Sequence, residues 1–475
     1  MSRVRRWLLP AAAALTLAST GALAPVALAQ PAALAAPQCD TTSAAYTYVV
    51  IYQPHTSQWQ VDKELAAKCG TKVAYYGEIG VAVATSRNAD FQEKIGAFRA
   101  YSGGREVAEP PATTAAEMRA EARSERENEE TVSVAAEGDL TAQQWDMRAI
   151  KAPEANKINP GSKSVTVGVL DSGVEPDHPG LKHAVDAKAS RGCNSGAPDA
   201  DPASWVTTSS DHGLHVAGTI AGKDTARGFT GVAPGVKVAS VKVVNEEGLI
   251  YPEAAVCGFM WAAKQGFEVT NNSYYVDPGM FYCPKQPGDA AAFEAVTRAV
   301  AYSQKKGVLN ISAAGNSGFD PKAQTTDPNR PHPVDPSCEI LPKGMDGVVT
   351  VSSVGYNGTK ASYSNYGQGQ VEVTAPGGDR AQLPPPGEGA GCTLSTVFNG
   401  QYGTKCGTSM ASPHAAGVAA LLASKYRHLP PQALSFLLQA KADPVSCGGA
   451  AGCVGPDHYN SFYGRGLVNA LRAVK

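Results

Sequence analysis

The amino-acid sequence predicts an α/β fold over residues 139–475, with a mainly parallel central sheet between helices and a small α+β unit ahead of it. Two observations predict this fold. Segments typical of strands and of helices alternate from residue 165 onward, and polar residues that can do chemistry follow directly after several of the strands. Alternation of this kind requires right-handed crossovers, which give a parallel sheet with helices on both faces. Functional residues are then expected in loops at the carboxyl ends of the strands.

The alternating segments can be placed by their hydrophobic periodicity. The strand segments are short and rich in Val and Ile, whereas the helical ones are longer and rich in Ala. Strands are expected at residues 165–170, 236–244, 268–273 and 308–313, and helices at 212–221, 252–264 and 289–305.

A compact unit is expected ahead of this domain, at about residues 40–110. Its predicted order is strand, helix, strand, strand, helix, at residues 46–52, 57–68, 71–76, 80–85 and 88–99. Residues 112–138 are charge-dense and nearly free of large apolar side chains, so they form no core. Such an exposed linker suits a proteolytic cut.

The N-terminus resembles a secretory signal peptide. Arg3, Arg5 and Arg6 precede a short apolar run, and Ala-Leu-Ala at residues 27–29 fits a cleavage site before Gln30. No later segment approaches the 18 or so apolar residues of a membrane span. The mature protein is therefore expected to be soluble, extracellular and a monomer, without a membrane partner.

Ten cysteines agree with an oxidising compartment. Cys447 and Cys453 bracket a short loop and are expected to pair, and Cys392 is the nearest candidate partner for Cys406. The remaining connectivity stays open. The 43 acidic and 41 basic residues nearly cancel and no basic tract appears, so nucleic acid is not an expected partner.

A serine stands where catalysis can use it. Ser409 lies within Cys-Gly-Thr-Ser-Met-Ala-Ser-Pro-His, residues 406–414, directly ahead of an apolar stretch that ends at Leu422. A serine at the start of a buried helix is aimed at amide dipoles that stabilise an oxyanion. It still needs a base and an orienter of that base. Asp171, after the first strand of the domain, and His212, at the start of a helix, supply these types in the order Asp, His, Ser.

That order and its three motifs resemble the subtilisin-like serine proteases, over residues 140–475. The chain order of the three triad residues differs between unrelated folds, and Asp, His, Ser is the order of the subtilisin-like family. The resemblance implies a three-layer subtilisin-like fold. It also implies that Ser409 is the nucleophile, His212 the general base and Asp171 the orienter of His212. Asn316, in Ala-Ala-Gly-Asn-Ser-Gly, matches the family's side-chain donor to the oxyanion.

The resemblance further implies a zymogen. Its parts are expected at residues 1–29 (signal peptide), 30–138 (inhibitor-like propeptide of ferredoxin-like fold, with an acidic linker) and 139–475 (peptidase domain). The propeptide would act as an intramolecular inhibitor until a cut between Val134 and Asp139 releases it.

Each residue also has a structural interpretation. Asp171 is also typical of a turn at a strand end, and Ser409 of a helix N-cap. His212 and His215 are spaced for a metal pair, but the sequence offers no third ligand nearby. His178 and His414, like His215, are expected to be buried structural histidines.

The expected substrate-binding segments depart from the family pattern. Where relatives commonly carry Ser-Leu-Gly-Gly, this chain has Ser273-Tyr274-Tyr275-Val, so bulky side chains are expected to narrow the pocket. Opposite it we expect Gly248 and Leu249 to bind substrate. Gly315 is expected to do so beside Asn316. A Pro/Asp-rich insertion at residues 317–342 is expected beside the same pocket.

The sequence requires no cofactor for catalysis and predicts no metal site there. Gly180 and Thr225 stand where relatives carry oxygen ligands of a structural calcium ion, so any calcium is expected to bind weakly. The predicted function is a secreted serine endopeptidase acting on polypeptides. Two alternatives stay open: a catalytically silent peptide binder of the same fold, and a hydrolase of esters or amides outside peptides.

Overall fold

The computed structural model describes residues 39–108, 132–134 and 138–475. The expected signal peptide and most of the expected linker, with the cut between Val134 and Asp139, lie outside these residues. In the described part of the chain, no helix has the length and apolar character that crossing a membrane requires.

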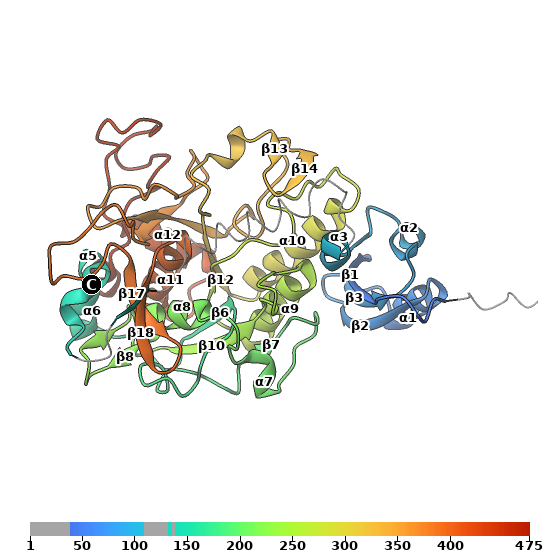
Figure 1. The fold of residues 1–475 in the computed structure, drawn as a ribbon, viewed down its shortest axis with the longest axis horizontal. Helices are drawn as coiled ribbons and strands as arrows, with labels where there is room; N and C mark the ends of the chain where they lie inside the picture. The colour runs from blue at the N-terminus through green and yellow to red at the C-terminus, as the bar shows by residue number, and fades with distance from the viewer. Residues whose placement is uncertain (1–38, 109–131, 135–137) are drawn as a thin grey trace, which may run out of the picture. The chain divides into compact units, whose positions relative to one another are not determined.

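A seven-stranded sheet forms the centre of residues 139–475 (Figure 1). Its strand order is β16-β15-β12-β11-β6-β10-β7, and every neighbouring pair is parallel. The strands are β6 (Thr166–Asp171), β7 (Arg191–Gly192), β10 (Lys237–Lys242), β11 (Val269–Asn272), β12 (Leu309–Ala313), β15 (Val349–Val354) and β16 (Val373–Pro376). The predicted α/β class with a mainly parallel sheet is confirmed.

Two layers of helices bury the two faces of this sheet. Alternate side chains of β6 point to opposite faces, as the period of a strand requires. Val167 and Val169 join the core made with α8 (His212–Ala221) and α11 (Thr408–Lys425). Leu170 joins the core made with α9 (Pro252–Gln265) and α10 (Asp289–Lys305). The sheet therefore has no solvent-facing side at the strands that carry the site.

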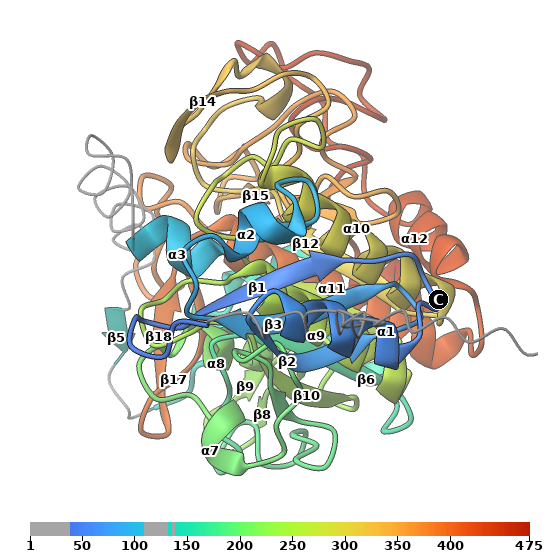
Figure 2. The same cartoon turned by 90° about the vertical axis from the view of Figure 1, so that its right-hand side faces the viewer.

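A hairpin, β17 (Thr393–Val397) and β18 (Gln401–Lys405), lies beside α8 in both views (Figures 1 and 2). The short strand β5 (Val132–Val134) adds to its edge, antiparallel to β18. The last described piece of the expected linker is thus held as a third strand by backbone hydrogen bonds.

The other elements of this domain are short or peripheral. They are η1 (Thr141–Gln143), α5 (Trp145–Ala149), α6 (Ala152–Ile158), α7 (Pro202–Trp205), β8 (Lys223–Asp224), β9 (Phe229–Thr230), η2 (Pro321–Ala323), β13 (Thr326–Asp327), β14 (Arg330–Pro333), α12 (Pro431–Ala440) and α13 (Ala470–Val474).

Residues 39–108, called here the N-terminal unit, contain a four-stranded antiparallel sheet in the order β2-β3-β1-β4. This is the strand order of a ferredoxin-like fold. Its elements are β1 (Tyr46–Ile51), α1 (Gln58–Ala67), β2 (Gly70–Tyr76), β3 (Val81–Ser86), α2 (Phe91–Ile95), β4 (Ala100–Tyr101) and α3 (Gly103–Ala108).

The helix expected at residues 88–99 is wrong in length. It ends at Ile95 because Gly96 adopts φ +118°, a backbone conformation that side-chain-bearing residues rarely take. The two-residue strand β4, which the sequence did not predict, follows it.

The N-terminal unit contacts α9, α10 and the loop near residue 196. The Tyr76 hydroxyl donates to the carbonyl of Gly196 at 2.7 Å. The Arg298 guanidinium of α10 donates to the carbonyls of Tyr52 and Ile79, at 2.7 and 2.9 Å. Val49, Ile79, Val81 and Tyr101 belong to the same apolar core as α9 and α10. The contact therefore combines apolar burial with charge-assisted hydrogen bonds.

The ten cysteines form five disulfides. Cys447–Cys453 and Cys392–Cys406 pair as the sequence suggests, and Cys39–Cys69 joins two residues of the N-terminal unit. Cys193–Cys257 and Cys283–Cys338 are pairings that the sequence left open.

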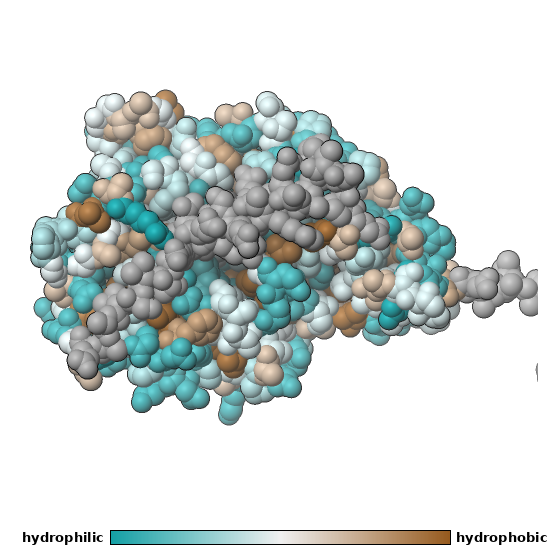
Figure 3. Space-filling model, viewed as in Figure 1, coloured by the Kyte–Doolittle hydropathy of each residue, from teal (hydrophilic) through white to brown (hydrophobic). Residues whose placement is uncertain are grey.

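On the face shown in Figure 3, hydrophobic residues are scattered among hydrophilic ones.

Candidate active site

Three neighbouring strands deliver the polar residues of the site at their carboxyl ends. Strands β12, β11 and β6 are adjacent in the sheet. Asp171 is the last residue of β6, Ser273 follows β11, and Asn316 follows β12 by three residues. Helices α8 and α11 begin beside these strand ends, with His212 and Thr408 as their first residues. The parallel sheet thus brings together residues that are far apart in the sequence.

Asp171 holds His212 in a fixed orientation. The Oδ1 atom of Asp171 lies 2.7 Å from Nδ1 of His212 and also accepts from the Ser172 amide at 2.7 Å. The carboxylate is almost fully buried, with 2% of its side chain exposed. Gly213 permits this approach, because a Cβ at that position would lie 2.6 Å from the Gly173 carbonyl oxygen. With Nδ1 facing the carboxylate, Nε2 is the ring nitrogen that can act as a base.

Ser409 is fixed at the start of α11 by reciprocal contacts with Ser273. The Ser409 hydroxyl lies 3.3 Å from the Ser273 carbonyl oxygen, and the Ser273 hydroxyl donates to the Ser409 carbonyl at 2.8 Å. Asn271 and Ser412 continue the network beneath: Asn271 donates to the Ser273 hydroxyl and accepts from Ser412. The hydroxyl of Ser409 therefore lies at the positive end of an 18-residue helix.

The amide group of Asn316 has a defined orientation. Its Oδ1 accepts from both the backbone N–H and the hydroxyl of Thr408, at 2.9 and 2.8 Å. Because a backbone N–H can only donate, Oδ1 must face Thr408, and Nδ2 is the other end of the amide. Asn365 braces the same loop by accepting from the Ser317 amide at 3.0 Å. Asn316 thus presents a donor from a rigid support.

These residues line one cleft with a volume of about 500 Å³. Asp171, His212, Ser409 and Asn316 line it together, so all four predicted catalytic residues are assembled at one place. The six residues predicted to bind substrate line it too: Gly248, Leu249, Ser273, Tyr274, Tyr275 and Gly315.

Residues 162–466 match the subtilase family. The chain belongs to that family. Subtilisin DY of Bacillus licheniformis is 31% identical over 326 residues, which cover 69% of this chain and 96% of that protein. Thermitase of Thermoactinomyces vulgaris is 29% identical over 337 residues, with 71% and 97% covered.

Solved structures agree on the fold. The epidermin leader peptide processing serine protease of Staphylococcus aureus has a TM-score of 0.68 at 21% identity, covering 91% of this chain and 98% of that one. A lanthipeptide protease has a TM-score of 0.55 at 25% identity, with 70% and 94% covered. The protein is therefore a serine-type endopeptidase that acts on polypeptides and, as a subtilase, needs no cofactor for catalysis.

The two tyrosines of this subtilase differ in environment. The Tyr274 hydroxyl points back to Asn272 at 3.3 Å and its ring packs on the α9 and α10 core, where burial and the nearby Asp171 carboxylate raise its pKa. Tyr275 packs instead with Met280 and Ile340, and its hydroxyl accepts from Asn329 at 3.1 Å. Of the pair, Tyr275 is the one tied to the insertion.

Several residues of the cleft were not predicted from sequence. Met280 and Ile340 line it, and so does an ion pair between Lys405 and Asp211, 3.0 Å apart. Asp211 directly precedes His212, so its position was a usable signal. Met280, Ile340 and Lys405 carry no local pattern that indicates a cleft.

The three histidines expected to be structural, His178, His215 and His414, are buried and hydrogen-bonded. Burial lowers the pKa of His215 well below its ordinary value, and its Nε2 lies 3.1 Å from the Thr393 carbonyl oxygen. His414 contacts the Asp146 carboxylate at 3.0 Å. His178 lies 3.0 Å from the Gln401 carbonyl oxygen. All three have the structural contacts expected of them.

The residues at the family's calcium position do not fit the ion. A Cβ at Gly180 would lie 2.9 Å from the Tyr402 hydroxyl, so a longer ligand has no room there. That hydroxyl donates to Asp224 at 2.8 Å, and the Arg227 guanidinium lies 5.7 Å from the ring centroid of Tyr402. The Tyr402 phenol thus occupies the space that a longer oxygen ligand at position 180 would need.

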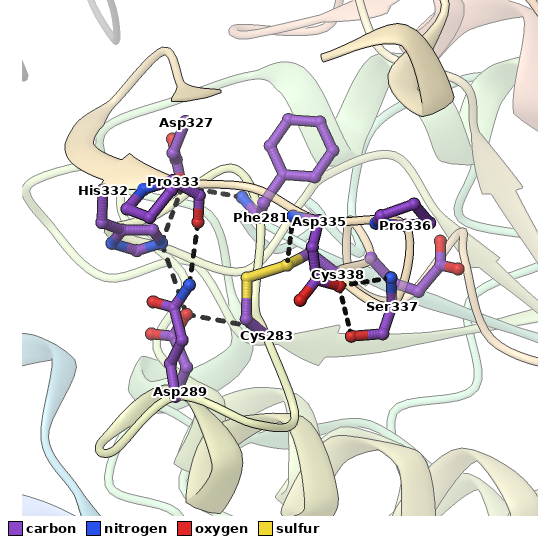
Figure 4. Close-up of a disulfide and its surroundings, with 12 residues drawn as sticks. Phe281, Cys283, Asp289, Asp327, His332, Pro333, Asp335, Pro336, Ser337 and Cys338 are labelled. Carbon is purple, nitrogen blue, oxygen red and sulfur yellow. Dashed lines mark hydrogen bonds and ion pairs between the residues drawn. A yellow bond between two sulfur atoms is a disulfide. The ribbon is translucent and has the colours of Figure 1, made fainter. Parts of the chain in front are cut away.

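Among the described residues, Cys283, Asp289 and His332 have the spacing of a metal site (Figure 4). The sulfur of Cys283 is bonded to Cys338, and Asp289 pairs with Arg330 at 2.8 Å. A disulfide sulfur is a poor metal ligand because it is not a thiolate. The Asp289 carboxylate is a poor ligand because it is already paired with a cation. This group is better explained as structural.

Proposed function

We propose that this subtilase is a secreted, self-maturing endopeptidase in which Asp171, His212 and Ser409 form the catalytic triad and Asn316 donates to the oxyanion. The 2.7 Å contact between Asp171 and His212, in one cleft with Ser409 at the start of α11, carries the proposal.

The reaction follows from these positions. His212 Nε2 takes the proton of Ser409 as Oγ attacks the peptide carbonyl carbon, and the buried Asp171 carboxylate stabilises the imidazolium that forms. The carbonyl oxygen becomes an oxyanion that accepts from Asn316 Nδ2 and the Ser409 backbone amide. His212 then gives its proton to the leaving amine, and water, deprotonated by His212, releases the acyl group.

The N-terminal unit is proposed as the inhibitory propeptide. Its contacts with Gly196 and Arg298 and its shared core with α9 and α10 support docking in the uncut chain. The antiparallel pairing of β5 with β18 supports a linker held in an extended form near the site. The five disulfides and the signal-like N-terminus support export.

The test is Ser409→Ala in the full chain, expressed in a protease-deficient host, with Ser424→Ala at the far end of α11 as the matched control. Self-maturation predicts that Ser409→Ala remains at full precursor mass, less the signal peptide, while the control is cut. His212→Ala should behave like Ser409→Ala, because removing either member of a triad costs nearly as much as removing all; the measured figures come from subtilisin itself. Intact-mass spectrometry reads the result.

Two outcomes would contradict parts of the proposal. Normal processing of both variants would mean that another protease matures the chain. Peptidase activity retained in mature Ser409→Ala would exclude Ser409 as the nucleophile. Parallel assays with peptide and ester substrates separate peptide cleavage from ester hydrolysis, and a silent binder would cleave neither.

A further inference from the structure

One wall of the cleft is built outside the sequence motifs that carry Asp171, His212, Asn316 and Ser409. Tyr275, Met280 and Ile340 line it, in the same cleft as Ala313 and Gly315. In the proposed mechanism the scissile carbonyl is bound between Ser409 and the Asn316 amide, so the side chain of the same substrate residue would enter the part of the cleft that this wall bounds. The position of the wall therefore decides which substrate side chain fits beside the scissile bond.

Two segments form the wall, residues 275–283 and 338–341, and they pair by backbone hydrogen bonds. Tyr282 and Glu339 exchange bonds of 2.9 and 3.0 Å, and the Val276 amide donates to the Leu341 carbonyl at 3.0 Å. The disulfide Cys283–Cys338 joins the residues next to this pair (Figure 4). The second segment is the end of the insertion, so the bridge ties the insertion to the wall.

Asp327 of the insertion holds the backbone that carries Met280. Its Oδ1 accepts from the Met280 amide at 3.3 Å and its Oδ2 from the Phe281 amide at 2.9 Å (Figure 4). Arg330 lies 3.3 Å from the same carboxylate, pairs with Asp289 at 2.8 Å, and donates to the Phe281 carbonyl. The Asp327 carboxylate is fully buried. A buried carboxylate with this set of donors fixes the loop rigidly.

The insertion also reaches the wall by side chains. Asn329 donates to the Tyr275 hydroxyl at 3.1 Å. Met280, Ile340 and Tyr275 pack in one apolar cluster with both cysteines of the bridge. Every residue of this wall is thus positioned by the insertion.

We propose that Asp327 and the Cys283–Cys338 disulfide are positioning residues for substrate specificity: they hold the Tyr275–Met280–Ile340 wall inward and restrict the residue before the scissile bond to small and medium apolar side chains. The inference rests on the proposed function and names the substrate class of that site. Neither group touches substrate, so each acts through the position of the wall.

The test compares each change with a matched control. Cys283→Ala/Cys338→Ala is paired with Cys447→Ala/Cys453→Ala, which removes a disulfide outside the cleft. Asp327→Asn is paired with Asp335→Asn, an exposed carboxylate of the same insertion. For each mature enzyme, kcat/KM is measured on peptides that differ only in Ala, Leu or Phe before the scissile bond. The Phe-to-Ala ratio within one enzyme does not depend on the fraction folded.

We expect the Phe-to-Ala ratio of kcat/KM to rise about tenfold in both wall variants, because a pocket wall that can move aside discriminates less against large side chains. It should stay within about twofold of wild type in both controls. An unchanged ratio in the wall variants, or an equal rise in the controls, overturns the inference. Absence of peptide cleavage by the wild-type enzyme would instead overturn the proposed function.

If the double-cysteine variant does not fold, Asp327→Asn alone tests the same wall. A fall in all three kcat/KM values by one common factor would show a structural role only and would overturn the positioning role.

Discussion

Glu253 should make the stability of the uncut chain depend on pH. It lies in the first turn of α9, is 3% exposed, and its Oε2 has no hydrogen-bond partner in the described part of the chain. The N-terminal unit closes over it: a Cβ at Gly196 would lie 2.7 Å from Val83 and 3.1 Å from the Glu253 Cβ. Burial raises the pKa of Glu253 from 4.5 to about 8. The helix N-terminus favours the charged form by about 1 to 2 kcal/mol, which is less than the desolvation penalty, so desolvation dominates.

The linkage between protonation of Glu253 and folding sets the direction of this pH dependence. A carboxyl group whose folded pKa is raised stabilises the fold fully below its unfolded pKa of 4.5. This contribution falls as pH rises and is lost above about pH 8. At about 1.4 kcal/mol for each pH unit, the loss between pH 5 and 8 is at most about 4 kcal/mol. Tyr251, which interacts electrostatically with Glu253, and Tyr76, which bonds to Gly196, have pKa values raised by burial and stay neutral over this range.

The assay is urea unfolding at pH 5, 6.5 and 8, on Ser409→Ala protein with and without Glu253→Gln, so that self-digestion does not interfere. The two proteins should be about equally stable at pH 5, and the glutamine variant more stable by roughly 2 to 4 kcal/mol at pH 8. Glu78→Gln, an exposed change in the N-terminal unit, is the control and should show no such trend. A difference between the two proteins that stays constant with pH would refute the reasoning.

Three further changes test other parts of the molecule. Tyr275→Gly should broaden cleavage toward bulky side chains in kcat/KM, and an unchanged preference across a peptide library would exclude Tyr275 from the pocket. EDTA should leave the melting temperature nearly unchanged, because Gly180 and Thr225 stand where oxygen ligands of a structural calcium ion are expected. A thiol should lower the melting temperature, because each disulfide contributes about 2 to 5 kcal/mol to the free energy of unfolding. A sharp drop with EDTA alone would contradict this expectation. Arg298→Ala in the Ser409→Ala chain should speed hydrogen exchange in β1 and β3 several-fold, since two charge-assisted bonds are lost; unchanged exchange would mean that apolar contact suffices for docking.

Local signals predicted much of the fold. The helices His212–Ala221 and Asp289–Lys305 begin and end where the sequence places them. The predicted strands agree to within one or two residues, which is the usual uncertainty of element ends. The prediction of a helix over residues 88–99 was wrong in length because the amphipathic pattern continues past Gly96, whereas the helical backbone ends before that glycine. Hydrophobic periodicity depends on the side chains and does not indicate the φ angle of a glycine.

The wall of the cleft could not be predicted in the same way. The sequence shows a Pro/Asp-rich insertion with one cysteine, but nothing in it says that Asp327 accepts from backbone amides some 46 residues earlier. The number and spacing of the cysteines also do not identify Cys283 as the partner of Cys338, 55 residues away. Both contacts are set by tertiary structure. The four residues proposed as catalytic could be selected from the sequence because each lies in a short local motif, and the parallel sheet brings them into one cleft.

This difference implies that chemistry and specificity are supported by separate parts of the structure. Asp171 and Ala313 end β6 and β12, and Ser273 directly follows β11 between them, in a sheet buried on both faces, so the geometry at Ser409 depends on the core. The wall depends on one carboxylate and one disulfide at the rim of the same cleft. Changes that are distant and share no contacts add nearly independently in free energy. Variation in the insertion can therefore alter which peptides fit without disturbing the contact between Asp171 and His212.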